Sequence, residues 1–167
     1  MIAKFIISIL IICICSYLGI SKAKTYETRE KELKKIKSSL AFLKSKIEFT
    51  YEPIKEVFEQ ISKSVYLHKD NVFLTTIEQM KKLDINSAWN KSVEENVNFN
   101  NEDKEILIMF GKLLGKTDKS GQLSEIEITQ EFIEKQIEKA EQEKIKNSKL
   151  YKTLGIISGV GIVIILI

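Results

Sequence analysis

The chain has 167 residues, of which 44% are hydrophobic and 29% charged, and its 26 basic and 23 acidic residues give a formal net charge of +3. Basic and acidic residues are interspersed, whereas a nucleic-acid-binding domain would show clustered lysine and arginine with aromatic side chains between them. Two cysteines, both within an apolar segment, and a single histidine exclude a disulfide framework, a zinc site of the usual kind and a di-iron site that needs two histidines.

Residues 1–20 form an apolar segment with a single charge, Lys4. Twenty residues of helix span about 30 Å, which matches the hydrocarbon core of a bilayer. Small residues at Ser21 and Ala23 leave a cleaved signal peptide as an alternative. The apolar run is longer than a usual signal core, and the residues behind it have a helical period. The sequence therefore favours a retained transmembrane helix.

A single apolar stripe follows this segment, with residues three and four positions apart. Its members are Leu33, Ile36, Leu40, Leu43 and Ile47. The stripe predicts a bundle helix that continues out of the membrane. A parallel coiled coil between copies is the alternative, but Phe42 and Phe49 widen the stripe beyond a narrow seam. The helix is expected to end near Tyr51, because Pro53 cannot lie in a helix interior and suits the start of a second helix.

Three short amphipathic helices are predicted next. Their apolar residues are Ile54, Val57, Phe58 and Ile61, then Val72, Phe73, Ile77 and Met80, then Ala88, Trp89 and Val93. A turn is expected within residues 62–69, and Asn86 or Ser87 is expected to cap the last of the three. Trp89, the only tryptophan, is expected to fill the core, and an anchor for a partner is the alternative.

A fifth helix should begin after the Asn-rich break at residues 96–101. Glu102 and Asp103 would lie in its first turn, where negative charge is favourable. Its apolar residues are Ile106, Leu107, Met109, Phe110, Leu113 and Leu114. A corner over residues 110–122 then leads into the last helix, with Gly115 in the left-handed conformation and Thr117, Asp118 and Ser120 available as caps.

Residues 111–117 resemble a phosphate-binding loop that ends in Gly-Lys-Thr. That loop needs four residues between its first glycine and its Gly-Lys, and only three are present. It must also follow a β-strand, whereas the preceding residues have a helical period. The sequence therefore predicts a helix–turn–helix corner and no bound nucleotide.

The sixth helix is expected to run from about Ser120 to Lys152. Its buried seam would comprise Leu123, Ile126, Gln130, Ile133, Ile137 and Ala140. Beyond this seam the charged helix is expected to pack against the equally charged start of the first helix. Residues 151–167, extended back to Leu150, make a second transmembrane helix of about 27 Å.

Gly155 and Gly159 are four residues apart in this second apolar segment, a spacing that lets another membrane helix approach closely. The partner would be the first apolar segment or the same segment of another copy.

The flanking charges predict the orientation. Lysine and arginine concentrate on one side of the two segments, at Lys22, Lys24, Arg29, Lys31, Lys34, Lys35 and Lys37 after the first and Lys135, Lys139, Lys144, Lys146, Lys149 and Lys152 before the second. The positive-inside rule places the soluble part in the cytoplasm and both termini outside. The same lysines could hold the bundle against anionic lipid.

The pairs Ala88-Trp89, Phe110-Gly111 and Leu114-Gly115, with Asp118, Gln122 and an apolar segment at each end, resemble the stage III sporulation protein AB family. That family is similar to the platform proteins of type II secretion and type IV pilus systems.

The resemblance implies a non-enzymatic platform in the mother-cell membrane around the forespore, which couples a cytoplasmic secretion-type ATPase to the other membrane proteins of a channel complex. Platform proteins carry two such bundles and this chain one, so self-association stays open. Asp118, Gln122 and Trp89 are the candidate partner contacts, and the first two could instead only cap and pack the last helix.

The sequence thus predicts an all-α protein, an antiparallel bundle of about six helices flanked by an N-terminal and a C-terminal transmembrane helix. The expected domains are residues 1–20, 21–150 and 151–167. No nucleophile with a base, metal cluster or cofactor motif is visible, so no enzyme is expected. The alternatives are an extracellular tail-anchored surface protein and a membrane signalling adaptor.

Overall fold

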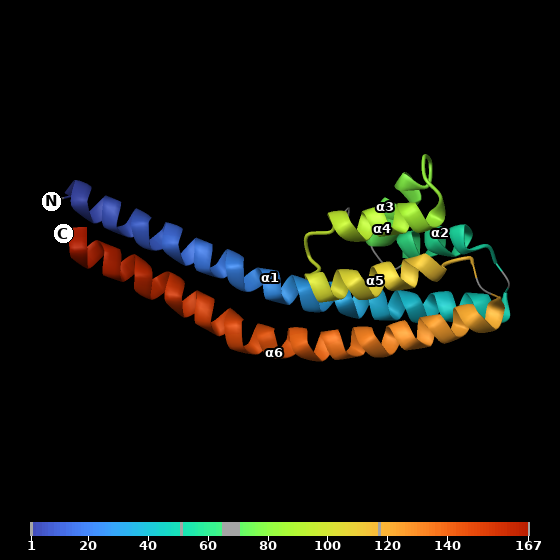
Figure 1. The fold of residues 1–167 in the computed structure, drawn as a ribbon. Coiled ribbons are helices and arrows are strands. Elements are labelled where there is room, and N and C mark those ends of the chain that lie inside the picture. Colours follow the sequence, from blue (N-terminus) through green and yellow to red (C-terminus); the bar gives the residue numbers. More distant parts are fainter. Residues whose placement is uncertain (1, 51, 65–70, 117, 167) are drawn as a thin grey trace. The chain divides into compact units, whose positions relative to one another are not determined.

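The structure is a computed structural model that describes residues 2–50, 52–64, 71–116 and 118–166 (Figure 1). The described residues form six α-helices and no β-strand, which confirms the predicted all-α class. The helices are α1 (Ile2–Phe49), α2 (Ile54–Ser64), α3 (Val72–Gln79), α4 (Ile85–Glu95), α5 (Asn101–Leu113) and α6 (Lys119–Leu166). Helix α2 ends at Ser64 and so includes the first three residues of the turn expected at residues 62–69. The remaining residues of that turn lie outside the described residues, as do Tyr51 and Thr117.

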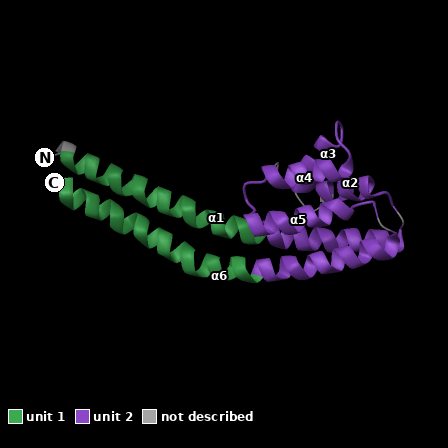
Figure 2. Ribbon diagram, viewed as in Figure 1, with its two compact units in different colours: residues 1–31, 138–167 green, residues 32–137 purple. Residues whose placement is uncertain are grey.

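The chain divides into two compact units (Figure 2). Unit 1 comprises residues 1–31 and 138–167, and unit 2 comprises residues 32–137. Helices α1 and α6 therefore supply residues to both units, and α2 to α5 belong to unit 2 alone. The domain boundaries predicted at residues 20 and 151 mark where the chain would enter a bilayer. The division into two compact units does not test them, so they stay a prediction.

In unit 2, α1 and α6 run antiparallel. Lys44 pairs with Glu127 at 2.7 Å, and Lys37 pairs with Glu134, so rising numbers in one helix face falling numbers in the other. The predicted stripe of α1 is buried throughout, from Leu33 to Ile47. Phe49 does not join it, because this side chain in the last turn of α1 is 73% exposed.

The short helices of unit 2 pack in chain order, α2 on α3, α3 on α4 and α4 on α5. An aromatic cluster joins all four. The Phe58 and Phe73 rings lie 5.1 Å apart, and both lie within 5.5 Å of the Trp89 ring. Phe110 of α5 contacts the same tryptophan at 5.5 Å between ring centroids. Such edge-on pairs stabilise a core beyond the burial of their area.

The helix starts of unit 2 use side-chain caps. Asp84 caps α4, accepting from the backbone N–H groups of Asn86 and Ser87 at 3.1 and 3.2 Å. The prediction of Asn86 or Ser87 as the cap was wrong, because the cap lies two residues before Asn86 and the helix begins at Ile85. Asn100 and Asp103 form a reciprocal capping box at the start of α5, in which each side chain accepts from the other's backbone N–H.

Candidate functional site

At the centre of the corner between α5 and α6, the backbone has the conformation that the sequence predicts. Gly115 has φ of 71°, the left-handed conformation that closes a helix. The last carbonyls of α5 find a partner in α4, where Asn86 Nδ2 donates to the oxygens of Gly111 at 2.6 Å and Leu114 at 3.0 Å. A helix end leaves such carbonyls without intrahelical partners, so Asn86 fixes the end of α5 onto the start of α4.

Trp89 and Gly111 form one close contact beneath this corner. The Trp89 indole N–H donates to the Leu107 carbonyl at 2.7 Å, and the side chain is 0% exposed. A Cβ added at Gly111 would lie 2.2 Å from Trp89 Cδ1, so only glycine fits there. The core role expected for Trp89 agrees with this geometry. A direct partner contact by Trp89 does not, because the ring is enclosed.

Gly111 therefore has a packing role. It lies inside α5 and follows a helical residue, so the near-match to a phosphate-binding loop lacks the strand that such a loop requires.

Asp118 is the cap of α6. Its Oδ1 accepts from the Gly121 N–H at 2.9 Å, and its carbonyl accepts from the Gln122 N–H at 2.9 Å. Of the three caps considered in the sequence, Ser120 lies within the first turn of the helix and Thr117 is outside the described residues. The Asp118 side chain is exposed, so capping the helix leaves it accessible to a partner.

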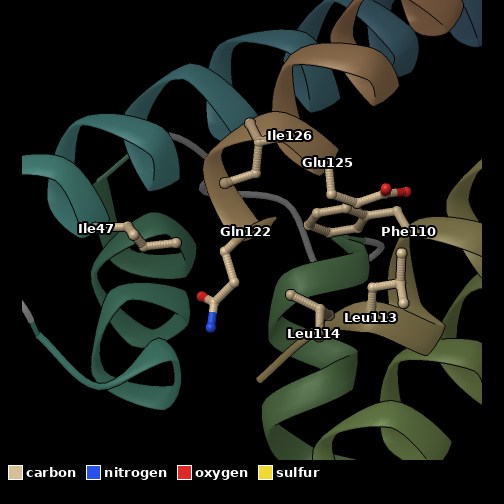
Figure 3. Close-up of a pocket in the computed structure, with 7 residues that line it drawn as sticks. All are labelled: Ile47, Phe110, Leu113, Leu114, Gln122, Glu125 and Ile126. Carbon is tan, nitrogen blue, oxygen red and sulfur yellow. The ribbon is translucent and has the colours of Figure 1, made fainter. Parts of the chain in front are cut away.

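Gln122 lines a small cavity where α1, α5 and α6 meet (Figure 3). Its side chain lies between Ile47 of α1 and Leu114, which follows α5. The other lining residues are Phe110, Leu113, Glu125 and Ile126. The volume of about 10 Å³ is that of one water molecule, too small for an organic ligand. Gln122 thus takes part in packing at the corner, and its role in partner binding stays a prediction.

A larger groove lies next to this cavity, between α5 and α6. Its volume is about 240 Å³, and its lining residues are Glu102, Glu105, Ile106, Met109, Glu125, Ile128, Thr129, Phe132 and Gln136. Met109 is 59% exposed, and Ile128 and Phe132 are 45% and 44% exposed. The groove was not predicted. The signal in the sequence is a second apolar stripe beside the buried one on each helix.

Glycines bring α1 and α6 together in unit 1. A Cβ at Gly155 would lie 2.8 Å from the Cys15 carbonyl oxygen and 3.1 Å from Gly19 Cα. A Cβ at Gly159 would lie 3.0 Å from Ile12 Cα. The sequence left two candidates for the helix that packs against Gly155 and Gly159: the first apolar segment of the same chain, or the same segment of another copy. In the structure the first apolar segment of the same chain packs there. Gly19, the matching small residue on α1, was not singled out in the sequence.

Polar pairs join α1 and α6 in the rest of unit 1, as expected for their charged stretches. Tyr26 stacks on Tyr151 with 5.9 Å between ring centroids. Arg29 pairs with Glu143 at 2.7 Å, and a second pair, Lys144 with Glu30, has the same length. Arg29 and Glu30 are buried, at 7% and 5% exposure, so both need these charged partners.

The apolar segments of unit 1 expose large hydrophobic side chains on the surface that faces away from the other helix. The exposed set includes Phe5, Ile6, Ile9, Leu18, Ile157, Ile164 and Ile165. Helices α1 and α6 are each long and apolar enough to cross a membrane, with mean hydropathy of 2.2 and 1.7 in their most apolar windows. A pair of such helices is compatible with a membrane location.

Comparison with known proteins decides the family. The sequence model described as stage III sporulation protein AB matches residues 4–167. The chain belongs to the stage III sporulation protein AB family. Stage III sporulation protein AB of Bacillus subtilis (strain 168) is 24% identical over 168 residues, which cover 98% of each chain.

A solved structure of stage III sporulation protein AB (SpoIIIAB) supports the fold of this family member. It covers 70% of this chain and 96% of its own, with a TM-score of 0.62 and 21% identity. The resemblance found in the sequence is thereby confirmed, and so is a role in sporulation.

Among the described residues no group of three or more histidine, cysteine, aspartate or glutamate side chains is placed to hold a metal ion. The pKa of Glu52 is lowered by hydrogen bonds from Lys46 and Gln60, so Glu52 joins the last turn of α1 to the middle of α2. The pKa of Asp84 is lowered by its hydrogen bonds with Ser87 at the start of α4.

Proposed function

We propose that the protein is a non-enzymatic, membrane-anchored component of a sporulation channel complex in the mother-cell membrane around the forespore. It would couple a cytoplasmic secretion-type ATPase to the other membrane proteins of that complex. The sporulation role follows from the family. The membrane anchoring, the side of the membrane, the partners and the absence of catalysis are parts of the proposal.

The observation that carries the proposal is the pair of apolar helices in unit 1. They contact each other through Gly19, Gly155 and Gly159, while large apolar side chains such as Phe5 and Ile165 are 74% and 85% exposed. Close packing through small residues with an apolar outer surface is typical of two helices inside a bilayer. In water the same surface would favour aggregation.

The lysines next to the apolar segments support a cytoplasmic location for unit 2. Lys22, Lys24, Lys149 and Lys152 are exposed within a few residues of the segments, and the nearest acidic residues are further along each helix. Only Lys4 lies at the other end. An excess of lysine on one side of short flanks marks the cytoplasmic side.

The partner contact is proposed at the corner, at Asp118 and Gln122. Asp118 is exposed and next to a turn, and α6, which it caps, also continues into the second apolar segment. A partner bound at this corner would thus contact a helix that leads to the membrane. The other membrane proteins of the complex, or a second copy, could contact the exposed apolar surface of unit 1.

The proposal is tested by isolating the full-length protein from sporulating cells in mild detergent. The cytoplasmic ATPase should be isolated with it, and in smaller amount with the double variant Asp118→Ala and Gln122→Ala. Glu94→Ala on the exposed surface of α4 is the matched control. An unchanged yield from the double variant would refute the corner as the contact, and absence of the ATPase from every preparation would refute the coupling role.

A further inference from the structure

The groove between α5 and α6 has a surface that unit 2 leaves uncovered. On α5, Ile106 and Met109 each lie one residue before the buried Leu107 and Phe110. On α6, Ile128 and Phe132 each lie close to the buried Thr129 and Ile133. Each helix therefore carries two adjacent apolar stripes, of which one packs in the core and the other faces the groove. Exposed apolar side chains gathered in one groove are a feature of many interaction sites.

The shape of the groove suits a helix. Its α6 wall extends over the residues from 125 to 136, which is about three turns or about 16 Å. The Gln136 side chain donates to Glu102 at 3.1 Å and joins the two walls at one end. The volume of about 240 Å³ exceeds the cavity of about 150 Å³ that accepts benzene in an engineered protein, so several apolar side chains fit.

The charge around the groove is acidic. Three carboxylates line it, those of Glu102, Glu105 and Glu125, and no lysine or arginine is among its lining residues. The ammonium group of Lys135 lies 5.6 Å from the centroid of the Phe132 ring, which lines the groove. Carboxylates on both walls attract a basic segment and repel anionic lipid or an acidic helix.

From this geometry we infer that the groove binds an amphipathic helix of a partner protein. The apolar residues of that helix, at positions i, i+4 and i+7, enter the groove between Met109 and Phe132. Lysine or arginine residues beside them face Glu105 and Glu125. This inference depends on the proposed function in one respect, because it expects the partner protein to belong to the same complex.

The test places the photoreactive amino acid p-benzoylphenylalanine at Met109 of the full-length protein in sporulating cells. After irradiation, mass spectrometry identifies the crosslinked peptide. The expected peptide belongs to another protein and has apolar residues at helical spacing with lysine or arginine beside them. The same amino acid at Lys91, which is exposed on α4, is the control and should not capture this peptide.

A charge variant provides the second readout. The double substitution Glu105→Gln and Glu125→Gln keeps the size of both side chains and should reduce the crosslinking yield from position 109 at least about threefold. An unchanged yield would overturn the electrostatic basis of the inference. Crosslinks only to a second copy of this chain, only to lipid, or to no molecule would overturn the inference as a whole.

The outcomes also separate this inference from the proposed function. If the ATPase is isolated with the protein while position 109 captures no basic helix, the groove assignment fails and the coupling role stands. If position 109 captures such a helix and the ATPase is never isolated with the protein, the groove assignment stands and the coupling role fails.

Discussion

The indole N–H of Trp89 donates to the carbonyl oxygen of Leu107 at 2.7 Å, and the ring is accommodated because Gly111, one turn further along α5, has no side chain. This contact connects the Ala88-Trp89 pair of α4 with the Phe110-Gly111 pair of α5, two of the short patterns by which the family resemblance was found. It also limits how close α4 and α5 approach in unit 2.

Gly111→Ala should therefore destabilise unit 2. The added Cβ would lie 2.2 Å from Trp89 Cδ1 and 2.6 Å from Asn90 Oδ1, so the indole or the helix must shift. Overpacking of this kind costs about 1–3 kcal/mol. Urea denaturation of the full-length protein in detergent, followed by the fluorescence of the single tryptophan, measures the change. Gly161→Ala is the control, since a Cβ there meets no atom within 4 Å; equal midpoints for the two variants would contradict the account.

Asn100→Ala should lower the stability of the same unit through α5. The Asn100 side chain accepts from the Asp103 N–H at 2.8 Å, and loss of an N-cap costs about 1 kcal/mol. The same urea denaturation measures it. Asn101→Ala, at the first residue of the helix, is the matched control and should have a much smaller effect. If both variants unfold at the same urea concentration as the parent protein, the capping box does not stabilise α5.

The contribution of Glu52 should depend on pH. Hydrogen bonds from Lys46 and Gln60 lower its pKa in the folded protein, so the folded state favours the ionised carboxylate. The stabilisation is present above the unfolded pKa and is lost as pH falls through the lower folded pKa. Glu52→Gln should lower the thermal midpoint at pH 7 and have no effect at strongly acidic pH.

Glu56→Gln, an exposed carboxylate on α2, controls for the loss of one negative charge. The Glu52 assignment is wrong if the difference between Glu52→Gln and the parent protein does not shrink as the pH is lowered.

The pairing of the two apolar segments can be tested with the native Cys15. A Cβ at Gly159 would lie 3.2 Å from Cys15 Cβ, close to the separation found in disulfides. Gly159→Cys combined with Cys13→Ser should therefore form a disulfide within one chain on mild oxidation in membranes. Gel electrophoresis without reductant should show a monomer of altered mobility. Gly161→Cys is the control. A covalent dimer from Gly159→Cys would show that the segment pairs with another copy.

The sequence predicted the helices and most of the core, because these follow from local periodicity. The spacing of Leu33, Ile36 and Leu40 fixes one buried face of α1, and Pro53 separates α1 from α2. Gly115 was predicted in the left-handed conformation for the same local reason. Family membership was predicted from short patterns that are weak singly but occur in a fixed order along nearly the whole chain.

The features that the sequence did not predict depend on which helices meet. Periodicity could not show that Asp84, and not Asn86 or Ser87, caps α4, since aspartate, asparagine and serine are all favoured at that position. Met109 was counted among the apolar residues of the fifth helix, and Phe132 lies outside the seam predicted for the sixth. Only the approach of α5 to α6 shows that both side chains line an exposed groove. Phe49 was misplaced for the same reason, and Gly19 gained its role only when Gly155 of α6 lay beside it.

We propose that unit 2 lies in the cytoplasm and that the apolar segments of α1 and α6 cross the membrane, and cysteine labelling tests this topology directly. The protein would carry Cys13→Ser, Cys15→Ser and Lys63→Cys, with the new cysteine exposed on α2, and would be produced in growing cells. A membrane-impermeant maleimide is added to intact cells. We expect no labelling at position 63 until the membrane is opened, and immediate labelling of a matched Lys4→Cys variant. Immediate labelling at position 63 would place unit 2 outside the cell and refute a cytoplasmic location.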